Sequence, residues 1–289
     1  MHGVEHMRAY KPFQTFVVLA FLIGHASAAR AQTTFPLSVS SRTATAMIAL
    51  PGGYAADLSL EFEDVVGLHA GALEVSARVL SPMDMLAVVP RLPGGVAASI
   101  PLTYPVLLKI EPTPTSTLAL AGIVKISVHT HNLTFNVASP LGLYSASAGG
   151  PFADLTRSAG IGSYRVDGSG GGFSEFVIAA DARPIGTIIA QKFDALQATL
   201  TEYASSIPST VLTPLQDQLN LAESLYSAGL VPGAIAVVTG FGYVVKAHSG
   251  SEIPDVWRAN VDGANIAGLL RSRADTLRFS LIVAANQLP

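Results

Sequence analysis

The chain has 289 residues, of which 49% are hydrophobic and 13% are charged, with a formal net charge of −3 at pH 7 and no cysteine. A mildly acidic chain with few charges lacks the basic surface that nucleic acids require, which excludes a nucleic-acid partner. The absence of cysteine excludes disulfides and thiol catalysis, so the hydrophobic core alone must hold the fold together.

The amino-terminal segment, residues 1–31, is typical of a cleavable secretory signal. Arg8 and Lys11 precede an apolar run over residues 13–24, and small residues in an Ala-x-Ala pattern then place the cleavage after Ala31. About a dozen apolar residues are too few to cross a hydrocarbon core of about 30 Å. We expect a secreted or periplasmic protein with no integral membrane span after cleavage, because no later segment is uninterruptedly apolar for long enough.

Residues 32–182 show short strand-like runs separated by glycine, proline and serine. The period of two is clearest where Leu58, Leu60 and Phe62 alternate with polar residues. Strands are expected at 43–50, 56–63, 73–80 and 173–178, a hairpin or kinked pair at 123–135, and a flexible loop at 167–172. This pattern predicts an antiparallel β-sandwich, although a closed barrel would produce the same pattern.

From Arg183 onward the apolar period becomes helical. The first stripe recurs every three or four residues from Ile189 to Tyr203, and three more follow at 212–226, 235–245 and 266–281. Glycine and proline fall between the stripes, where helices should end and begin. Short connections between amphipathic helices predict an up-and-down bundle.

The sequence therefore predicts a segregated α+β fold in three parts. Residues 1–31 form the signal peptide, residues 32–182 an antiparallel β-sandwich domain, and residues 183–289 a C-terminal helical bundle domain.

The helical part resembles the FIMAH-type modules that are appended to secreted and cell-surface bacterial proteins. The resemblance is carried by the spacing of Leu215, Leu219 and Ala222, by Gly229, and by the apolar stripe over 234–245. It implies a compact bundle in which an amphipathic helix returns after a turn of small residues.

A second resemblance covers nearly the whole mature chain. It rests on Ile253–Ala259 (IPDVWRA), with 264–268 and 274–280 after it and 162–165 and 173–176 before it. These segments resemble an exported bacterial family known only as a domain of unknown function. The resemblance implies no activity.

No established catalytic signature occurs in the sequence. The chain lacks Gly-x-Ser-x-Gly, and the glycine cluster at 168–172 lacks the ending of a phosphate-binding loop. We therefore expect no catalytic residue and no cofactor. Carboxylates from distant strands could still pair for glycoside hydrolysis. The candidates on the expected strands are Glu61, Glu63, Glu74 and Glu175.

Two histidines form the only candidate metal site. His129 and His131 are two residues apart on an expected strand, so both imidazoles face the same side and could chelate zinc or copper. A third ligand would have to come from His69, Glu61 or Asp154. The alternative is that both histidines only satisfy local hydrogen bonds, and no metal is then expected.

Trp257 and Arg258 form the candidate partner-binding site, because tryptophan and arginine often dominate interfaces. They are expected in the loop before the last helix, where the alternative is a structural role that fixes this loop. For a glycan partner, stacking faces could come from tyrosines. The candidates are Tyr54, Tyr104, Tyr144 and Tyr164.

These observations favour an exported, non-enzymatic protein that binds another envelope or extracellular protein, or a glycan. The alternative is a carbohydrate- or peptide-active hydrolase that uses dispersed carboxylates or a His129/His131 metal site. A subunit of a larger envelope complex is a third possibility, which an exposed apolar patch would indicate.

Overall fold

A computed structural model describes residues 32–135, 139–160 and 162–286. The described residues belong to one compact unit. The predicted signal peptide and its cleavage point lie outside them.

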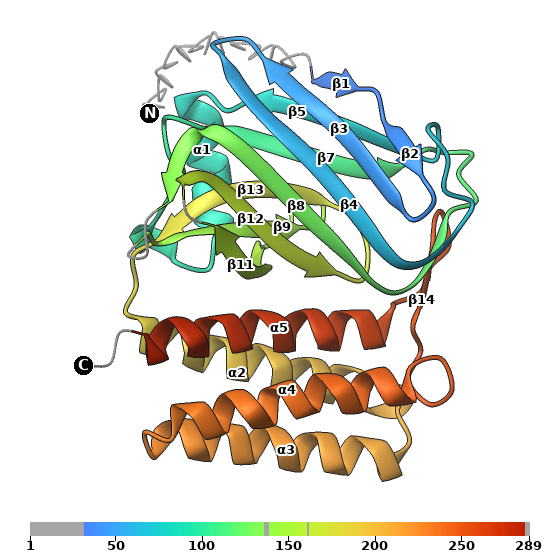
Figure 1. The fold of residues 1–289 in the computed structure, drawn as a ribbon, viewed down its shortest axis with the longest axis vertical. Coiled ribbons are helices and arrows are strands. Elements are labelled where there is room, and N and C mark those ends of the chain that lie inside the picture. The colour runs from blue at the N-terminus through green and yellow to red at the C-terminus, as the bar shows by residue number, and fades with distance from the viewer. Residues whose placement is uncertain (1–31, 136–138, 161, 287–289) are drawn as a thin grey trace, which may run out of the picture. The chain divides into compact units, whose positions relative to one another are not determined.

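The amino-terminal part consists of two antiparallel sheets (Figure 1). The first sheet has the order β1 (Thr33–Phe35), β5 (Leu73–Val79), β7 (Val106–Pro112), β13 (Glu175–Asp181), β9 (Leu141–Ala146) and β10 (Ala153–Asp154), with β6 (Ala98–Ser99) paired to β13. The second has the order β11 (Thr156–Gly160), β12 (Gly162–Gly170), β8 (Ala119–Phe135), β4 (Tyr54–Val66), β3 (Thr43–Leu50) and β2 (Ser38–Ser40), with β14 (Val256–Arg258) paired to β8.

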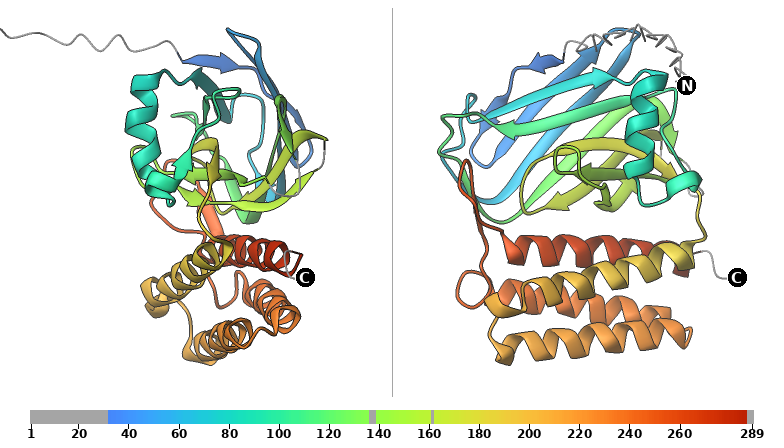
Figure 2. Two further views of the ribbon diagram at one scale, coloured as in Figure 1. Left: turned by 90° about the vertical axis from the view of Figure 1, so that its left-hand side faces the viewer. Right: turned by 180° about the vertical axis from the view of Figure 1, so that it is seen from behind.

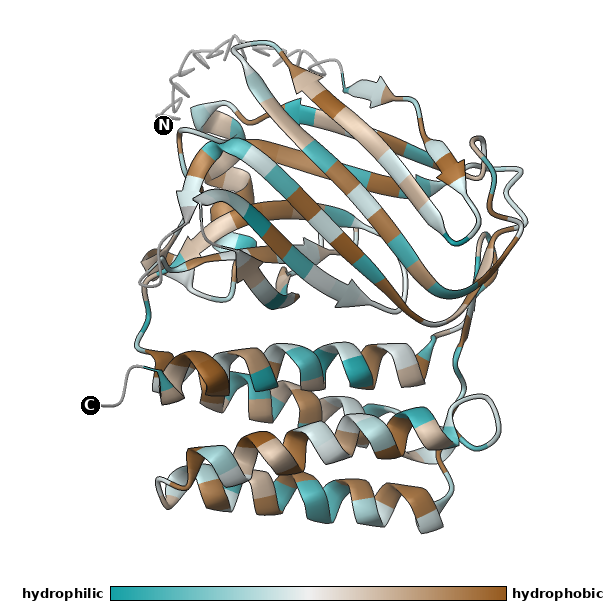
Figure 3. Cartoon of the chain, viewed as in Figure 1, coloured by the Kyte–Doolittle hydropathy of each residue, from teal (hydrophilic) through white to brown (hydrophobic). Residues whose placement is uncertain are grey.

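Alternating hydrophobic and polar residues explain why the two sheets share one core. In β3 every second residue from Ala44 to Leu50 is buried, and β4 follows the same period. Figure 3 shows this alternation as bands along β3, β4 and β8. The inward residues of both sheets form one cluster, which includes Ile48, Leu60 and Ile126 from the second sheet and Val75 and Ile110 from the first.

The predicted strands are confirmed where hydrophobic and polar residues alternate strongly. They are wrong in a glycine-rich segment and in one unusually long strand. β3 has the predicted bounds 43–50. Residues 123–135, predicted as a hairpin or kinked pair, belong to one 17-residue strand, β8. The predicted flexible loop at 167–172 is wrong in its first part, because β12 continues to Gly170 and pairs with β8. The pairing of β8 with β12 and with β4 shifts register, and in both cases the extra residues lie in β8, which bulges but continues as one strand.

A helical segment between β5 and β6 covers the outer side of the first sheet (Figure 2). It contains α1 (Pro82–Val88) and two short 3-10 helices, η1 (Val89–Arg91) and η2 (Gly95–Ala97). Ser81 caps α1, because its hydroxyl accepts from the Asp84 N–H while the Asp84 carboxylate accepts from the Ser81 N–H. The sequence analysis missed α1, since seven residues are too few to show a helical period.

The carboxyl-terminal part consists of four longer helices, so the fold class is mixed α+β. They are α2 (Ile185–Glu202), α3 (Ser209–Ser227), α4 (Val231–His248) and α5 (Ile266–Ala285), with the 3-10 helix η3 (Ala204–Ser206) after α2. The predicted apolar stripes form one buried cluster, with Ile189, Leu215, Phe241 and Leu277 as examples. The change from strands to helices falls between β13 and α2. Whether the two parts are separate domains stays a prediction.

Helix α4 is long and apolar enough to cross a membrane by its length and composition. Buried residues of a core helix satisfy the same criterion, and α4 places Val231, Ala234, Val238, Phe241 and Val245 in the cluster that the four helices share. The expectation of no membrane span after cleavage therefore stays a prediction.

Helix α5 lies against the second sheet (Figure 1). Asn265 caps its amino terminus by accepting from the Gly268 N–H and donates to the Gly122 carbonyl, 2.5 Å away. Glu63 on β4 forms ion pairs with Arg271 of α5 at 2.5 Å and with Lys246 of α4 at 2.9 Å. Polar contacts thus join the sheet to both helices.

Candidate functional site

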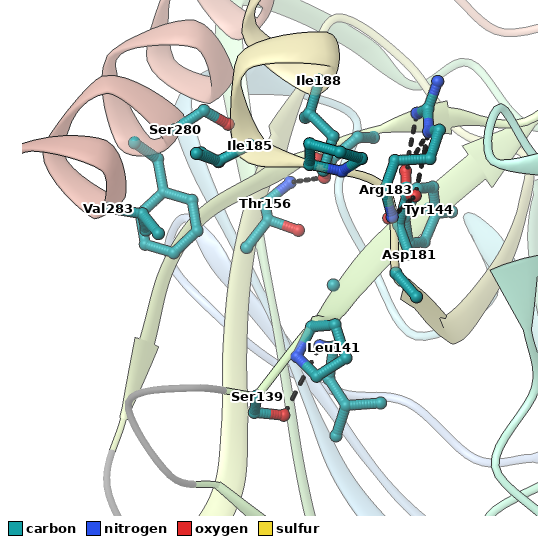
Figure 4. Close-up of a pocket in the computed structure, with 16 residues that line it drawn as sticks. Ser139, Leu141, Tyr144, Thr156, Asp181, Arg183, Ile185, Ile188, Ser280 and Val283 are labelled. Atoms are coloured by element: carbon teal, nitrogen blue, oxygen red, sulfur yellow. Dashed lines mark hydrogen bonds and ion pairs between the residues drawn. The ribbon is translucent and has the colours of Figure 1, made fainter. Parts of the chain in front are cut away.

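A cavity of about 360 Å³ lies at the seam between the first sheet and the helices (Figure 4). Its walls come from β9, from the segment between β13 and α2, and from the end of α5. Apolar side chains of α2 and α5 line one side, among them Ile185, Ile188 and Val283. The Asp181–Arg183 pair lies across the cavity from Val283. The cavity therefore offers an apolar wall opposite a polar one.

Asp181 and Arg183 form a bidentate ion pair at the polar wall. The Asp181 side chain is 5% exposed, and its oxygens accept from Arg183 Nε at 2.9 Å and from Arg183 Nη2 at 2.6 Å. The Arg183 backbone N–H also donates to the carboxylate. Since these contacts close the turn from β13 into α2, the pair fixes the wall of the cavity.

Asp154, the second carboxylate of the cavity, is paired with Lys192 of α2. The Lys192 Nζ lies 2.6 Å from Asp154 Oδ2, 2.8 Å from Ser280 Oγ and 3.1 Å from the Thr276 carbonyl oxygen. An ammonium group has three N–H donors, and here each one has an acceptor. Lys192 is therefore held as a charged donor, joining β10, α2 and α5.

A second cavity, of about 300 Å³, is lined by both residues of this ion pair. Asp154 lines both cavities, whereas Lys192 and Thr276 line only the second. Its remaining walls are mostly apolar, and they also contain Arg273 of α5. The two cavities share Asp154 in their walls, and together they form the candidate binding site.

Tyr144 packs under the polar wall of the first cavity and is 3% exposed. Burial raises the pKa of its hydroxyl well above the usual 10, and the nearby charges of Asp154 and Asp181 raise it further. Tyr144 therefore stays protonated and can act only as a neutral hydrogen-bonding group.

The site does not have the features of an activated nucleophile. Ser280 lies beside Lys192, a pairing that some hydrolases use, but Lys192 donates to Ser280 and has no free lone pair to accept the hydroxyl proton. Asp154 and Asp181 each face a cation, whereas glycoside hydrolysis requires one protonated carboxyl group.

A family model described as a family of unknown function, DUF6689, matches residues 19–285. The chain belongs to this family. No curated protein and no solved structure matches the chain. The resemblance to a domain of unknown function is thus confirmed, whereas the resemblance to FIMAH-type modules stays a prediction.

In this DUF6689 chain the two candidate metal ligands lie together on the outer face of the second sheet. The rings of His129 and His131 are 4.6 Å apart. Among the described residues, no three histidine, aspartate or glutamate side chains form a group that could hold a metal ion. Glu61 lies opposite Lys125 of β8, which is four residues, or about 13 Å along the strand, from His129. Glu61 is therefore too far from His129 to serve as the third ligand.

His129 instead contacts two residues that the sequence analysis did not connect with it. Its Nε2 lies 2.8 Å from Ser163 Oγ on β12, and its Nδ1 lies 3.6 Å from Asp57 Oδ2 on β4. The side chain of Asp57 is 63% exposed, and Ser163 is also exposed. Only the strand register, with β8 between β4 and β12, brings these three residues together.

Trp257 and Arg258 lie in β14 and not, as predicted, in a loop. Trp257 is half-buried, pairs with Leu120 of β8, and packs edge-to-face on Phe173 with a centroid distance of 5.5 Å. Arg258 is exposed. These contacts fit the alternative interpretation, in which Trp257 fixes the segment before α5. Partner binding by Trp257 and Arg258 stays a prediction.

The other candidate residues lie apart. Glu175 pairs with Arg91 at 2.7 Å on the first sheet, and Glu63 belongs to the seam on the second. The prediction that tyrosines offer stacking faces is wrong for three of the four, because they face the cores. The buried tyrosines are Tyr104, Tyr144 and Tyr164.

The sequence contains a signal for this site in the helical stripes. Lys192 falls three residues after Ile189 and four before Leu196, so a charge interrupts the apolar stripe of α2. Arg273 interrupts the stripe of α5 in the same way, four residues before Leu277. A charge on a core-facing stripe requires a buried partner or a ligand, so these two positions predict a buried polar site.

Proposed function

We propose that this chain is an exported, non-enzymatic binding protein that holds a small molecule in the seam cavities. The observation that carries the proposal is the cavity of about 360 Å³ with an apolar wall facing the Asp181–Arg183 pair. Ligand sites are typically concave, mostly apolar and lined by a few fixed polar groups. The adjoining cavity of about 300 Å³ enlarges the same site.

The proposal includes a finer architecture, a β-sandwich of the two sheets followed by an up-and-down helical bundle. The core shared by both sheets supports the first, and the core shared by α2 to α5 supports the second. Such parts supply rigid walls, and Glu63 and Asn265 tie the second sheet to the helices. A ligand at the seam would therefore bind to preformed walls.

A fluorescent apolar probe tests the proposal directly. N-phenyl-1-naphthylamine should bind to the purified mature chain with saturable, one-to-one stoichiometry and increased fluorescence. The cavity-filling substitutions Val283→Trp and Ala195→Phe, one in each cavity, should weaken this binding. Leu221→Trp, at an exposed position of α3, serves as the control and should leave binding unchanged. Unsaturable binding, or binding that neither filling variant alters, would contradict the proposal.

Export to a secreted or periplasmic location is the second part of the proposal. It is supported by the signal-like pattern over residues 1–31 and by the absence of cysteine. Sequencing the amino terminus of the protein recovered from extracytoplasmic fractions should find Gln32 as the first residue. An intact Met1 on the recovered protein would contradict it.

The partner is proposed to be another envelope or extracellular protein, or a glycan. Four large hydrophobic side chains of one segment around α1 are exposed, which supports a protein contact on that side of the molecule. They are Met83, Leu86, Val96 and Leu102. Trp257 and Arg258 are the alternative contact.

A hydrolase is the second candidate function, because His129 contacts Ser163 with one ring nitrogen and Asp57 with the other, as the histidine of a catalytic triad does. Ser163 Oγ would attack the carbonyl carbon of an ester or peptide, and His129 Nε2 would pass the hydroxyl proton to the leaving group. Water would then release the acyl group from Ser163.

The Ser163→Ala and His129→Ala variants test this second candidate. Hydrolysis of p-nitrophenyl acetate by the chain should fall to the level of free imidazole in both variants if the triad acts. A rate that Ser163→Ala leaves unchanged removes the hydrolase from consideration. His131→Ala is the matched control, since its ring is adjacent to that of His129 but has no contact with Ser163.

A further inference from the structure

The second seam cavity contains a cation, Arg273, that has no ion-pair partner within the part of the chain that the structure describes. Arg273 lines this cavity, and no ion pair or hydrogen bond of its side chain occurs among the described residues. Its Nε is buried and has no hydrogen-bond partner there. Buried polar groups are nearly always hydrogen-bonded, so a guanidinium in this position points to a missing acceptor.

The charges around Arg273 leave the cavity positive. Glu202 and Tyr203, at the end of α2, are the groups that favour its charged form, and Glu202 is exposed. Lys192 also lines the cavity, but Asp154 compensates its charge at 2.6 Å. Burial lowers the pKa of Arg273, as expected for a guanidinium with little compensation. An arginine nevertheless remains charged at neutral pH.

The rest of the cavity wall is mainly apolar. Its lining includes Phe152, Leu155, Ala195 and Leu269. Gln191, at the same wall, can both donate and accept a hydrogen bond. A molecule that fits must therefore combine an apolar body with one anionic group.

We propose that this cavity binds a small amphiphilic anion, with a carboxylate, sulfonate or phosphate group on the Arg273 guanidinium and its apolar body against Phe152, Leu155 and Leu269. This inference rests on the proposed function and specifies its ligand class. An arginine fork matches the oxygens of such groups with two parallel hydrogen bonds. The apolar walls from β10 and α5 then exclude water from the pair.

Two probes with one aromatic frame test the proposal. 8-Anilinonaphthalene-1-sulfonate carries a sulfonate, and N-phenyl-1-naphthylamine is nearly the same molecule without it. The intact mature chain should bind the sulfonate at least about tenfold more tightly, the size of one charge-assisted contact. Raising the salt concentration should weaken only the binding of the sulfonate.

Substitutions at Arg273 locate the effect. Arg273→Gln should weaken sulfonate binding by about tenfold and leave binding of the neutral probe unchanged, and Arg273→Lys should restore most of the loss. Arg278→Gln is the matched control, because it removes an arginine from the same helix at a position that lines neither cavity. Circular dichroism verifies that each variant is folded, and the salt titration of the unaltered chain provides a test if Arg273→Gln is not.

The outcomes separate this inference from the proposed function. If both probes bind equally and Arg273→Gln changes neither, the anion site is wrong while the ligand cavity stands. If neither probe binds, both are wrong. Tighter sulfonate binding that Arg278→Gln reduces as much as Arg273→Gln would also overturn the anion site.

Discussion

Individual charged residues determine how the seam is held together. Lys192 and Asp154 are both largely buried, and removing one leaves the other without compensation. Their role is positional, because the pair joins β10 to α2 at the wall of the second cavity.

Lys192→Met tests the contribution of this pair. The substitution removes three hydrogen bonds and leaves the Asp154 carboxylate unpaired, so we expect the free energy of unfolding to fall by about 3–5 kcal/mol. Adding Asp154→Leu should recover much of the loss, because no unpaired buried charge then remains. Urea unfolding of the two single variants and the double variant measures both values, and a loss below about 1 kcal/mol would show that the pair does not hold the seam.

Glu63 makes stability depend on acid pH. Burial alone would raise the pKa of this carboxyl group, but hydrogen bonds from Arg271, Lys246 and one backbone N–H lower it from 4.5 to about 2. Because the folded pKa lies below the unfolded one, the stabilisation is complete above pH 4.5 and is lost as the pH falls toward 2.

Glu63→Gln should therefore destabilise the chain by about 1–2 kcal/mol near pH 7, with a difference that shrinks between pH 4.5 and 2. Urea unfolding at a series of pH values measures it. Glu61→Gln is the control, since Glu61 is exposed and 3.9 Å from Lys125. A difference between Glu63→Gln and the unaltered chain that is independent of pH would contradict the assignment.

At the scale of the elements, helix α5 approaches the sheet through Gly268. A Cβ at this position would lie 2.5 Å from the Gly122 carbonyl oxygen, so no larger residue fits without moving α5. Gly240 of α4 has no atom near its would-be Cβ. The two glycines thus have opposite roles in helices of the same protein.

Alanine at each glycine should have effects of opposite sign. Gly240→Ala should stabilise the chain by about 0.5–1 kcal/mol, as alanine usually does within a helix. Gly268→Ala should destabilise it by about 1–3 kcal/mol, because the added methyl group clashes with backbone. Thermal unfolding measures both, and the argument fails if Gly268→Ala is neutral.

The elements that could be predicted from the sequence are those with a strong period. The strand at 43–50 and the four apolar stripes of the helices are long, regular and bounded by glycine or proline. The helix α1 was missed because its capping box precedes only seven residues. Residues 167–170 were predicted as a loop because glycine usually breaks strands. Here they belong to β12, which is hydrogen-bonded to the longer strand β8.

The candidate site was less predictable than the fold, because it is made by tertiary contacts. Asp154 and Lys192 lie 38 positions apart, and only the packing of α2 on the first sheet brings them to 2.6 Å. His129 and Ser163 meet through strand register in the same way. Local periodicity carries no information about either pair.

At the scale of the whole molecule, several contacts join the sheets to the helices. β14, between α4 and α5, adds a strand to the second sheet, and the polar contacts of Glu63 and Asn265 cross the same seam. The described residues also form one compact unit.

We therefore expect one cooperative unfolding transition. The single tryptophan, Trp257, reports on the seam through its fluorescence, whereas circular dichroism at 222 nm reports mainly on α2 to α5. The two signals should change at the same urea concentration. Two separate midpoints would show that residues 32–182 and 183–289 are independent domains.

The central claim is that a small amphiphilic anion binds at the seam, and a crystal structure of the mature chain with 8-anilinonaphthalene-1-sulfonate tests it most directly. The account predicts electron density for the sulfonate on the guanidinium of Arg273 and for the aromatic rings against Phe152 and Leu155. Density for the probe at the outer surface alone, with both seam cavities unchanged, would contradict it.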